Sequence, residues 1–257
     1  MVNINETEFV KKQYKESDNL NTRISIHEKY STNKLGLQNW YFTKYIIKDG
    51  MKILELGCGT AAMWINRKDV ISRCGKLILS DFSEGMLKTA KENIGDYDNV
   101  EYKTIDIQNI PFEDENFDMV IANFMLYHVP DIDRAVSEVS RVLKKGGHFY
   151  AGTNGKRGVM PCISEMLELE NKYESSFTLE NGGDKIKPYF ESVIIERYED
   201  SLRVTDMDDL LDYIFSGIFF SENCTFSREE VREKLGKYVN DGAIILEKDP
   251  GMFVAVK

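Results

Sequence analysis

The sequence has few of the features that mark disulfide-bonded, zinc-binding or nucleic-acid-binding proteins. Its four cysteines are scattered, and no two form a Cys-x-x-Cys pair (Cys58, Cys74, Cys162 and Cys224). Reduced thiols in a cytosolic protein are therefore a simpler interpretation than a disulfide framework or a metal site. Basic residues are outnumbered by acidic ones, 33 against 43, and the formal net charge is −10. This balance disfavours a polyanionic partner such as nucleic acid.

Long apolar runs are also missing. Residues 1–16 lack the apolar centre of a secretory signal peptide. The longest apolar segment, LLDYIFSGIFF at 210–220, contains an aspartate and falls short of the roughly 18 to 20 residues that span a bilayer. No repeat, low-complexity tract or linker is visible. We therefore expect residues 1–257 to form a single cytoplasmic domain that contacts neither membrane nor nucleic acid, with its oligomeric state left open.

Short β-rich runs alternate with helical patterns in the first part of the chain. The runs are expected to be strands at 52–57, 76–82, 100–106, 117–124 and 147–154. Helical patterns lie between them, and the clearest, at 131–143, places apolar residues on one stripe and ends before Gly146 and Gly147. Such alternation predicts right-handed crossovers and a doubly wound parallel sheet in an α/β fold.

The pattern is weaker on both sides of this region. Residues 1–48 are expected to be helical, with Trp40, Tyr41 and Phe42 packing against the sheet. Beyond residue 156, helices are expected at 160–173, 206–219 and 227–239, and strand-like runs at 192–205. The last segment, AIILEKDPGMFVAVK, has two apolar runs around Asp-Pro-Gly, which is typical of a β-hairpin.

The first strand ends in a glycine turn. Ligands of open parallel sheets bind beyond the carboxyl ends of the strands, and here Gly57 and Gly59 flank Cys58 at such an end. Glycines allow a tight turn and a close backbone approach to a ligand. The dinucleotide fingerprint has a third glycine, whose position is taken by Ala62. The glycines alone therefore leave a nucleotide site and a tight turn without a ligand as alternatives.

Glu55 separates these alternatives better. It lies two residues before the first glycine, where a carboxylate would repel a phosphate. Such a carboxylate suits a ligand that carries positive charge and amine donors. The competing interpretation is a glutamate on the exposed side of a strand end.

The second strand also ends in an acidic residue. Asp81 can accept hydrogen bonds from both hydroxyls of a ribose, and the neighbouring Phe82 can pack on an adenine. Alternatively, Asp81 or Ser83 caps the helix that begins near Glu84.

The next two strands end in further candidates. After the third strand, Asp106 can accept from an adenine amino group while Ile107 covers a ring face; the alternative is a solvated loop aspartate. After the fourth strand, Asn123 is positioned for a backbone or ligand contact, and Tyr127 and His128 follow it.

Four features occur in order along the chain: ELGCGT at 55–60, the acidic end of the second strand, the aspartate after the third, and FDMVIANFMLYHVPDIDRAVSEVSRVLKKGGHFY at 117–150. Together they resemble class I S-adenosylmethionine-dependent methyltransferases of the small-molecule group. The resemblance covers residues 50–155. It implies a Rossmann-like seven-stranded sheet whose last strand is antiparallel, a helical lid at 1–48, and substrate-side helices and a terminal hairpin at 156–257. It also implies that S-adenosylmethionine is bound by Glu55, Gly57, Cys58, Gly59, Asp81, Phe82, Asp106, Ile107 and Asn123.

The segment around residues 19–42 resembles the amino-terminal lid of some bacterial members. Arg23, His27 and Tyr30 follow a helical spacing that puts them on one face. That face could close over the cofactor, with Arg23 pairing to its carboxylate and Tyr30 nearby. An ordinary solvated polar face is the alternative.

The resemblance implies methyl transfer to a small organic acceptor, without a metal. The protein must place the acceptor in line with the methyl group and exclude water, and a hydroxyl acceptor benefits from a base. His128 is the candidate base, against a structural histidine as the alternative; Tyr14 and Tyr127 are weaker candidates for acceptor contacts. A nicotinamide-dependent oxidoreductase is the second hypothesis, disfavoured by Glu55 and by Ala62 at the third glycine position. A non-catalytic module that binds S-adenosylmethionine is the third.

Overall fold

The computed structural model describes residues 25–169, 175–216 and 225–257. The chain is divided into two compact units, each assembled from segments that are far apart in the sequence. The first, which we call the sheet unit, contains Tyr41–Asn154, Ser175–Arg197 and Gly251–Lys257. The second, the ribbon unit, contains the described residues of Met1–Trp40, Gly155–Glu174 and Tyr198–Pro250.

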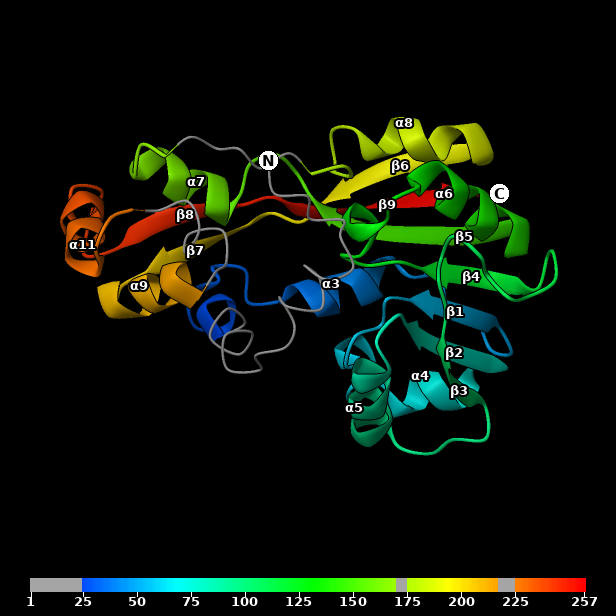
Figure 1. Ribbon diagram of the computed structural model, residues 1–257. Helices are drawn as coiled ribbons and strands as arrows, with labels where there is room; N and C mark the ends of the chain where they lie inside the picture. Colours follow the sequence, from blue (N-terminus) through cyan, green and yellow to red (C-terminus); the bar gives the residue numbers. More distant parts are fainter. Residues whose placement is uncertain (1–24, 170–174, 217–224) are drawn as a thin grey trace. The chain divides into compact units, whose positions relative to one another are not determined.

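A seven-stranded sheet forms the centre of the sheet unit, with the strand order β3-β2-β1-β4-β5-β9-β6 (Figure 1). The strands are β1 Lys52–Leu56, β2 Lys76–Asp81, β3 Val100–Thr104, β4 Phe117–Ile121, β5 Leu143–Asn154, β6 Ser192–Arg197 and β9 Pro250–Val256. Neighbouring strands from β3 through β1 and β4 to β5 are parallel, whereas β9 pairs antiparallel to β6. The expected doubly wound sheet with an antiparallel last strand is confirmed.

The strand order places a switch point between β1 and β4. The chain moves outward from β1 to β2 and β3 on one side, and from β4 to β5 on the other. Right-handed crossovers then put the connecting helices on opposite faces, and ligands of such sheets bind at the carboxyl ends of the strands beside the switch point. The connecting helices are α4 Lys68–Arg73, α5 Glu84–Ile94 and α6 Ile132–Val142. Two short segments lie at the strand ends, η1 Ala62–Trp64 and η2 Leu126–His128.

The apolar stripe predicted on α6 is its buried face. Ile132, Ala135, Val136 and Val139 are at most 7% exposed and belong to the same core cluster as Leu54 of β1. The helix begins at an Asp131 cap, whose side chain accepts from the Arg134 N–H at 3.0 Å. Beyond β5, α8 Gly182–Ile186 and η3 Lys187–Tyr189 continue this layer before β6.

The helix predicted at 131–143 is confirmed as α6, but the role of the two glycines after it was wrong. The helix ends at Val142, and Gly146 and Gly147 lie inside β5 instead. Between β4 and β5 the register shifts, from Phe117 opposite Leu143 to Met119 opposite His148. Gly146 has a φ of +72°, and a Cβ on Gly147 would lie 2.8 Å from a backbone oxygen. The two glycines therefore form an irregularity within a strand rather than a helix cap.

The ribbon unit has its own small sheet and its own core. Strand β7 Asp200–Val204 pairs antiparallel with β8 Ile244–Lys248. Around this pair, α7 Val159–Met166, α9 Met207–Ser216, α11 Arg228–Gly236 and helical residues 25–30 contribute to one buried cluster. Helix α3, Leu37–Lys44, contains residues of both units. The helices expected at 160–173, 206–219 and 227–239 are present as α7, α9 and α11, although α7 and α11 end before the predicted ends. Of the expected helical segment 1–48, residues 1–24 lie outside the described residues, and the rest is helical only at 25–30 and 37–44.

The expected terminal hairpin was wrong. β8 pairs with β7 in the two-stranded sheet, whereas β9 is inserted between β5 and β6 in the seven-stranded one. Gly251 does not have the positive φ of a turn glycine; a Cβ there would lie 2.5 Å from the backbone oxygen of Glu196. This glycine allows close strand approach, and Pro250 is the first residue of a strand, a position that proline tolerates.

In the described ranges, no helix is long and apolar enough to cross a membrane. Within the same residues, no group of three or more histidine, cysteine, aspartate or glutamate side chains could hold a metal ion.

Candidate cofactor site

The turn after β1 requires glycine at its first position. Gly57 and Gly59 have φ values of +71° and +55°, in the left-handed region that favours glycine. A Cβ on Gly57 would lie 2.8 Å from the Cβ of Met125, whereas nothing lies within 4 Å of a Cβ added to Gly59. Cys58 between them is buried, and burial raises the pKa of its thiol. The turn therefore combines a left-handed backbone, which glycine adopts readily, with close packing against the segment after β4.

Glu55 points into the protein rather than to solvent. Its side chain is 2% exposed, and its Oε2 accepts a hydrogen bond from the indole Nε1 of Trp64 at 2.5 Å. Burial raises the pKa of this carboxyl to about 7; the Trp64 hydrogen bond lowers it, and the charge of Asp81 raises it further. The alternative of an exposed strand-end glutamate was wrong. Glu55 is a buried carboxyl with no basic partner among the described side chains.

We expect the Glu55→Gln substitution to stabilise the cofactor-free protein at neutral pH. Below about pH 4.5 the carboxyl is protonated in both the folded and the unfolded state. As pH rises to about 7, the unfolded state ionises first, so wild-type stability falls, while glutamine keeps an acceptor for Trp64. The gain should grow across this range and level off above it, at about 3 kcal/mol at most. Thermal unfolding of both proteins between pH 4.5 and 8 measures it.

A matched control for this prediction is Glu101→Gln. Salt bridges to Lys103 and Lys76 hold the pKa of the Glu101 carboxyl below its usual range, so its ionisation favours the folded state. Its substitution should give no gain that increases with pH. An equal pH dependence for the two variants would contradict the buried state of Glu55.

Asp81 lies at the carboxyl end of β2, next to the glycine turn. Its Oδ2 accepts from the Gly59 N–H at 2.9 Å, and its Oδ1 accepts from the Ser83 N–H at 2.8 Å. The Ser83 hydroxyl, in turn, accepts from the Met86 N–H and caps α5. The capping alternative is thus filled by Ser83, while each Asp81 oxygen keeps lone pairs for further donors.

The residues predicted around the adenine differ in exposure. Phe82 is 58% exposed, unusually high for a large apolar side chain at a strand end. Asp106 is exposed and accepts from the backbone and side-chain N–H groups of Gln108 at 2.9 to 3.2 Å. Ile107 is 3% exposed within the core cluster. Phe82 and Asp106 thus have groups that a ligand can reach, whereas the Ile107 side chain packs into the core.

Asn123 is held in one orientation at the end of β4. Its Oδ1 accepts from the Gly152 N–H at 3.1 Å, and its Nδ2 donates to the hydroxyl of Tyr45 at 2.7 Å. A Cβ on Gly152 would lie 2.6 Å from that Oδ1, so the small residue makes room for the amide. Asn123 thus joins β4 to β5 and to the segment after α3.

Sequence reasoning missed Trp64 and Tyr45. Trp64 is 1% exposed, and its ring meets Phe42 edge-on at 5.5 Å between ring centroids, on the face of the sheet that holds Glu55. Tyr45 is 8% exposed and packs edge-on against Tyr150 at 4.8 Å between centroids. The available signal was a tryptophan nine residues after a strand glutamate, which does not by itself predict a hydrogen bond. Tyr41 contacts the sheet as expected, because its hydroxyl donates to the Gly251 carbonyl of β9 at 3.3 Å. Phe42 packs on Trp64 instead, and Trp40 packs on Tyr198.

The other predicted residues make contacts of their own. His128 ends η2 after β4, and its ring lies edge-on to Tyr127 at 4.5 Å between centroids. Tyr30 belongs to the ribbon unit, where it is 7% exposed and donates a hydrogen bond to Asp209. Arg23 and Tyr14 lie outside the described residues.

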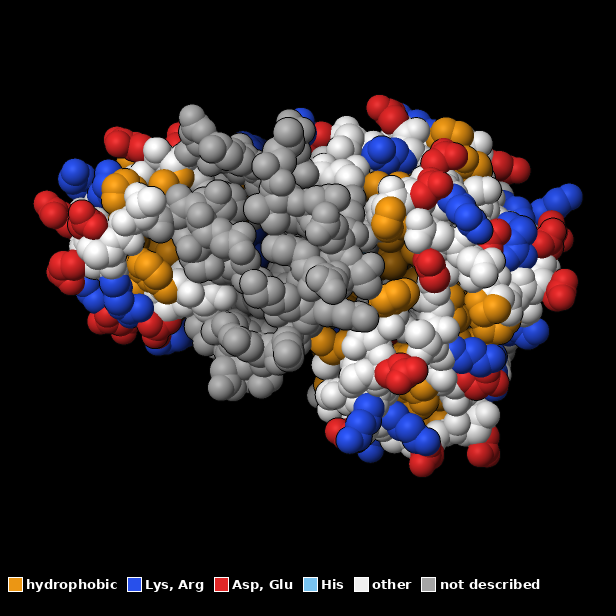
Figure 2. All heavy atoms as spheres, viewed as in Figure 1, with side chains coloured by type: hydrophobic (Ala, Val, Ile, Leu, Met, Phe, Trp, Pro, Cys, Tyr) orange, Lys and Arg blue, Asp and Glu red, His pale blue; other side chains and the backbone are white. Residues whose placement is uncertain are grey.

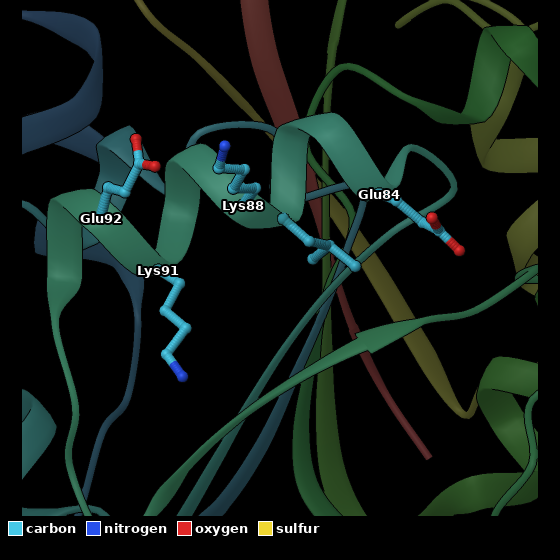
Figure 3. A pocket seen from close by; sticks show the side chains of 5 residues that line it. Glu84, Lys88, Lys91 and Glu92 are labelled. Carbon is cyan, nitrogen blue, oxygen red and sulfur yellow. The ribbon is translucent and has the colours of Figure 1, made fainter.

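An open pocket lies along α5 (Figure 3). It is lined by Glu84, Leu87, Lys88, Lys91 and Glu92, all from one helix. Figure 3 shows the charged side chains spread along the helix rather than converging on one point. This pocket therefore carries none of the features of the strand-end cluster.

The strand-end residues fit S-adenosylmethionine better than a dinucleotide. Glu55 is a buried carboxyl that lacks a cation, and an amine or sulfonium ligand supplies one. Asp81 presents acceptors suited to ribose hydroxyls beside the glycine turn. Together with the strand order 3-2-1-4-5-9-6 and its antiparallel β9, these residues define the class: this is the fold of class I S-adenosylmethionine-dependent methyltransferases. The chain contains a methyltransferase domain of this class, and S-adenosylmethionine is the cofactor that the class implies.

Comparison with known sequences agrees with this class. Residues 54–151 match the family described as methyltransferase domain. The demethylmenaquinone methyltransferase of Staphylococcus saprophyticus subsp. saprophyticus is 36% identical over 130 residues, covering 51% of this chain and 54% of that protein. The enzyme of the same name from Staphylococcus aureus strain MRSA252 is 36% identical over 164 residues, covering 62% and 64%. The match therefore spans between about half and two thirds of the length of these relatives.

Solved structures share the fold at low identity. Haemonchus contortus phosphoethanolamine N-methyltransferase 2, in complex with phosphomonomethylethanolamine and S-adenosylhomocysteine, is 19% identical with a TM-score of 0.60, covering 100% of this chain and 60% of that one. The [4+2]-cyclase SpnF is 16% identical with a TM-score of 0.60, covering 100% and 97%. At these identities the likeness shows the fold alone, and the second name shows that one protein of this fold is a cyclase.

Proposed function

We propose that the protein transfers the methyl group of S-adenosylmethionine to a small organic acceptor. The observation that carries the proposal is the buried Glu55 carboxyl beneath the glycine turn, which has a tryptophan N–H but no cation as its partner among the described side chains. A phosphate ligand would leave this carboxyl beside a second negative charge. A positively charged cofactor would instead offset the negative charge of the Glu55 carboxylate.

The other strand-end residues follow from this placement. Asp81 would hold the ribose hydroxyls, and the exposed Phe82 and Asp106 would contact the adenine. Asn123, locked by Gly152 and Tyr45, would face the methionine portion. The cofactor supplies an activated methyl group when bound. The protein binds and orients both partners and keeps water away from them.

A small acceptor is supported by the relatives and by the surface. The matched relatives are named demethylmenaquinone methyltransferases, so demethylmenaquinone is the first acceptor to test. Figure 2 shows acidic and basic side chains interspersed on the visible face of the sheet unit, rather than one basic patch for a polyanion. For a hydroxyl acceptor, His128 would act as the base, since it follows β4 and imidazole is the side chain that most often serves as a general base.

Calorimetry with S-adenosylmethionine, S-adenosylhomocysteine and NAD tests the cofactor, and a turnover assay over a panel of phenols, amines, thiols and demethylmenaquinone tests the reaction. We expect binding of the first two ligands and methylation of at least one acceptor. Tight binding of NAD without S-adenosylhomocysteine would favour the nicotinamide-dependent oxidoreductase. Binding of S-adenosylhomocysteine without turnover of any acceptor would favour a non-catalytic module that binds S-adenosylmethionine.

A further inference from the structure

Strand β6 forms one open edge of the seven-stranded sheet. Among the described residues it pairs with β9 alone, so the backbone groups on its other side have no strand neighbour. Ile194 and Ile195 are 54% and 48% exposed, although they follow each other and point to opposite faces. With Val193 they make three consecutive β-branched residues at the centre of the strand. Such a strand is a template for pairing with another strand.

The opposite edge of the same sheet is protected. Strand β3 carries Glu101 and Lys103, and Glu101 forms salt bridges with Lys103 and with Lys76 of the neighbouring strand. Charged side chains, lysine above all, discourage pairing at an edge. The central residues of β6 include no charge and no proline. Within one sheet, therefore, charged residues flank the central residue of one edge strand, whereas the centre of the other edge strand is apolar.

The sequence of β6 is complementary to itself. Two identical strands that pair antiparallel are related by a two-fold axis normal to the sheet. Each residue then lies opposite a residue of the second copy whose side chain is on the same face of the sheet. If the axis passes through Ile194, this residue meets Ile194 of the second copy, and Val193 meets Ile195. Further out, Ser192 meets Glu196, and Glu191 meets Arg197. Apolar residues thus meet at the centre, and opposite charges meet at both ends.

The neighbouring register lacks this match. With the axis through Ile195, Ile194 would face Glu196 of the second copy, and Val193 would face Arg197. Val193 and Ile194 of each copy would then lie opposite charged residues of the other copy. The charged residues at the ends of β6 therefore select the register centred on Ile194.

We propose that a second copy of this chain binds along β6, in antiparallel register about Ile194, and joins the two seven-stranded sheets into one continuous sheet across a two-fold axis. The pairing supplies a neighbour for the open backbone edge and covers the exposed isoleucines. Glu191 and Arg197 form the ion pairs at its two ends. This dimer is independent of the methyl-transfer proposal, because it concerns an edge rather than the strand ends.

The experiment is a mass measurement by light scattering and sedimentation velocity on the full chain. Wild-type protein should have twice the 29.6 kDa mass of one chain. Ile194→Lys puts two lysines on the axis and should weaken dimerisation by about tenfold or more, because facing like charges cost several kcal/mol at an interface. Ile245→Lys is the matched control: Ile245 is 51% exposed, but it lies in β8 of the other sheet. It should leave the dimer intact.

A charge exchange tests the register separately from folding. Arg197→Glu should weaken the dimer by facing Glu191 with a like charge, and adding Glu191→Arg should restore it. Arg197 also pairs with Glu180 in its own chain at 3.3 Å. The second substitution does not repair that bond, so rescue reports the contact between copies. A monomeric wild type, a dimer insensitive to Ile194→Lys, or a double variant no better than Arg197→Glu would each overturn the proposal.

Discussion

Replacing Asp81 with alanine should weaken S-adenosylhomocysteine binding by about 10- to 150-fold, which corresponds to about 1.5 to 3 kcal/mol for hydrogen bonds to a charged acceptor. Two effects act together. The substitution removes the proposed acceptor for the ribose hydroxyls. It also leaves the Gly59 and Ser83 N–H groups without the carboxylate that holds them at 2.9 and 2.8 Å. Isothermal calorimetry on folded protein measures the loss.

Two further variants give this result its meaning. Asp81→Asn keeps an oxygen acceptor at the same place but removes the charge, so it should fall between wild type and Asp81→Ala. Asp96→Ala changes the net charge equally, but its side chain is 88% exposed beside Lys91, and it should bind as wild type does. Unchanged affinity in Asp81→Ala would show that the ribose lies elsewhere.

Gly57→Ala should destabilise the protein by about 2 to 5 kcal/mol, the sum of a left-handed backbone penalty and an overpacking penalty. At a φ of +71°, alanine is strained, and its Cβ would lie 2.8 and 2.9 Å from Cβ and Cγ of Met125. These atoms lie near the Met125 backbone and cannot swing away as a side-chain tip can. Thermal and chemical denaturation measure the loss of stability.

Gly59→Ala is the matched control for this clash. It introduces the same methyl group at a similar φ, +55°, with nothing within 4 Å. Its cost should be the backbone term alone, about 1 to 2 kcal/mol. Equal losses for the two variants would mean that Met125 moves aside freely and that packing at Gly57 contributes little.

The sequence predicted the strands that local patterning determines. The stretches ending at Leu56, Asp81 and Ile121 are apolar and flanked by turn residues, so their type and order could be inferred before any contact was known. The α6 stripe was equally local. The pairing of β8 and β9 could not be inferred in this way. Pro250 and Gly251 are as typical of a turn as of a strand that approaches Glu196 closely. Only contacts between distant segments separate the two.

The candidate site, too, was predictable from the sequence only in part. Glu55 and Asp81 were predicted because their chemistry is unusual for their positions at strand ends. The Trp64 hydrogen bond to Glu55 and the Tyr45 hydrogen bond to Asn123 depend on how η1 and the segment after α3 fold over the sheet. No periodicity encodes such contacts. Ile107 had an apolar side chain that suited a ring face equally well, yet it is a core residue.

The position of β9 also affects how the protein is made. β6 ends at Arg197, but its only sheet neighbour in the described residues begins at Pro250, so a ribosome delivers the edge strand well before the strand that joins it to β5. Until then, β5 and β6 both present unpaired backbone, and the apolar residues Val193 to Ile195 have no neighbour on either side. Incomplete chains should therefore be the form most prone to aggregation and most dependent on chaperones. Translation that pauses before Pro250 would prolong that exposure.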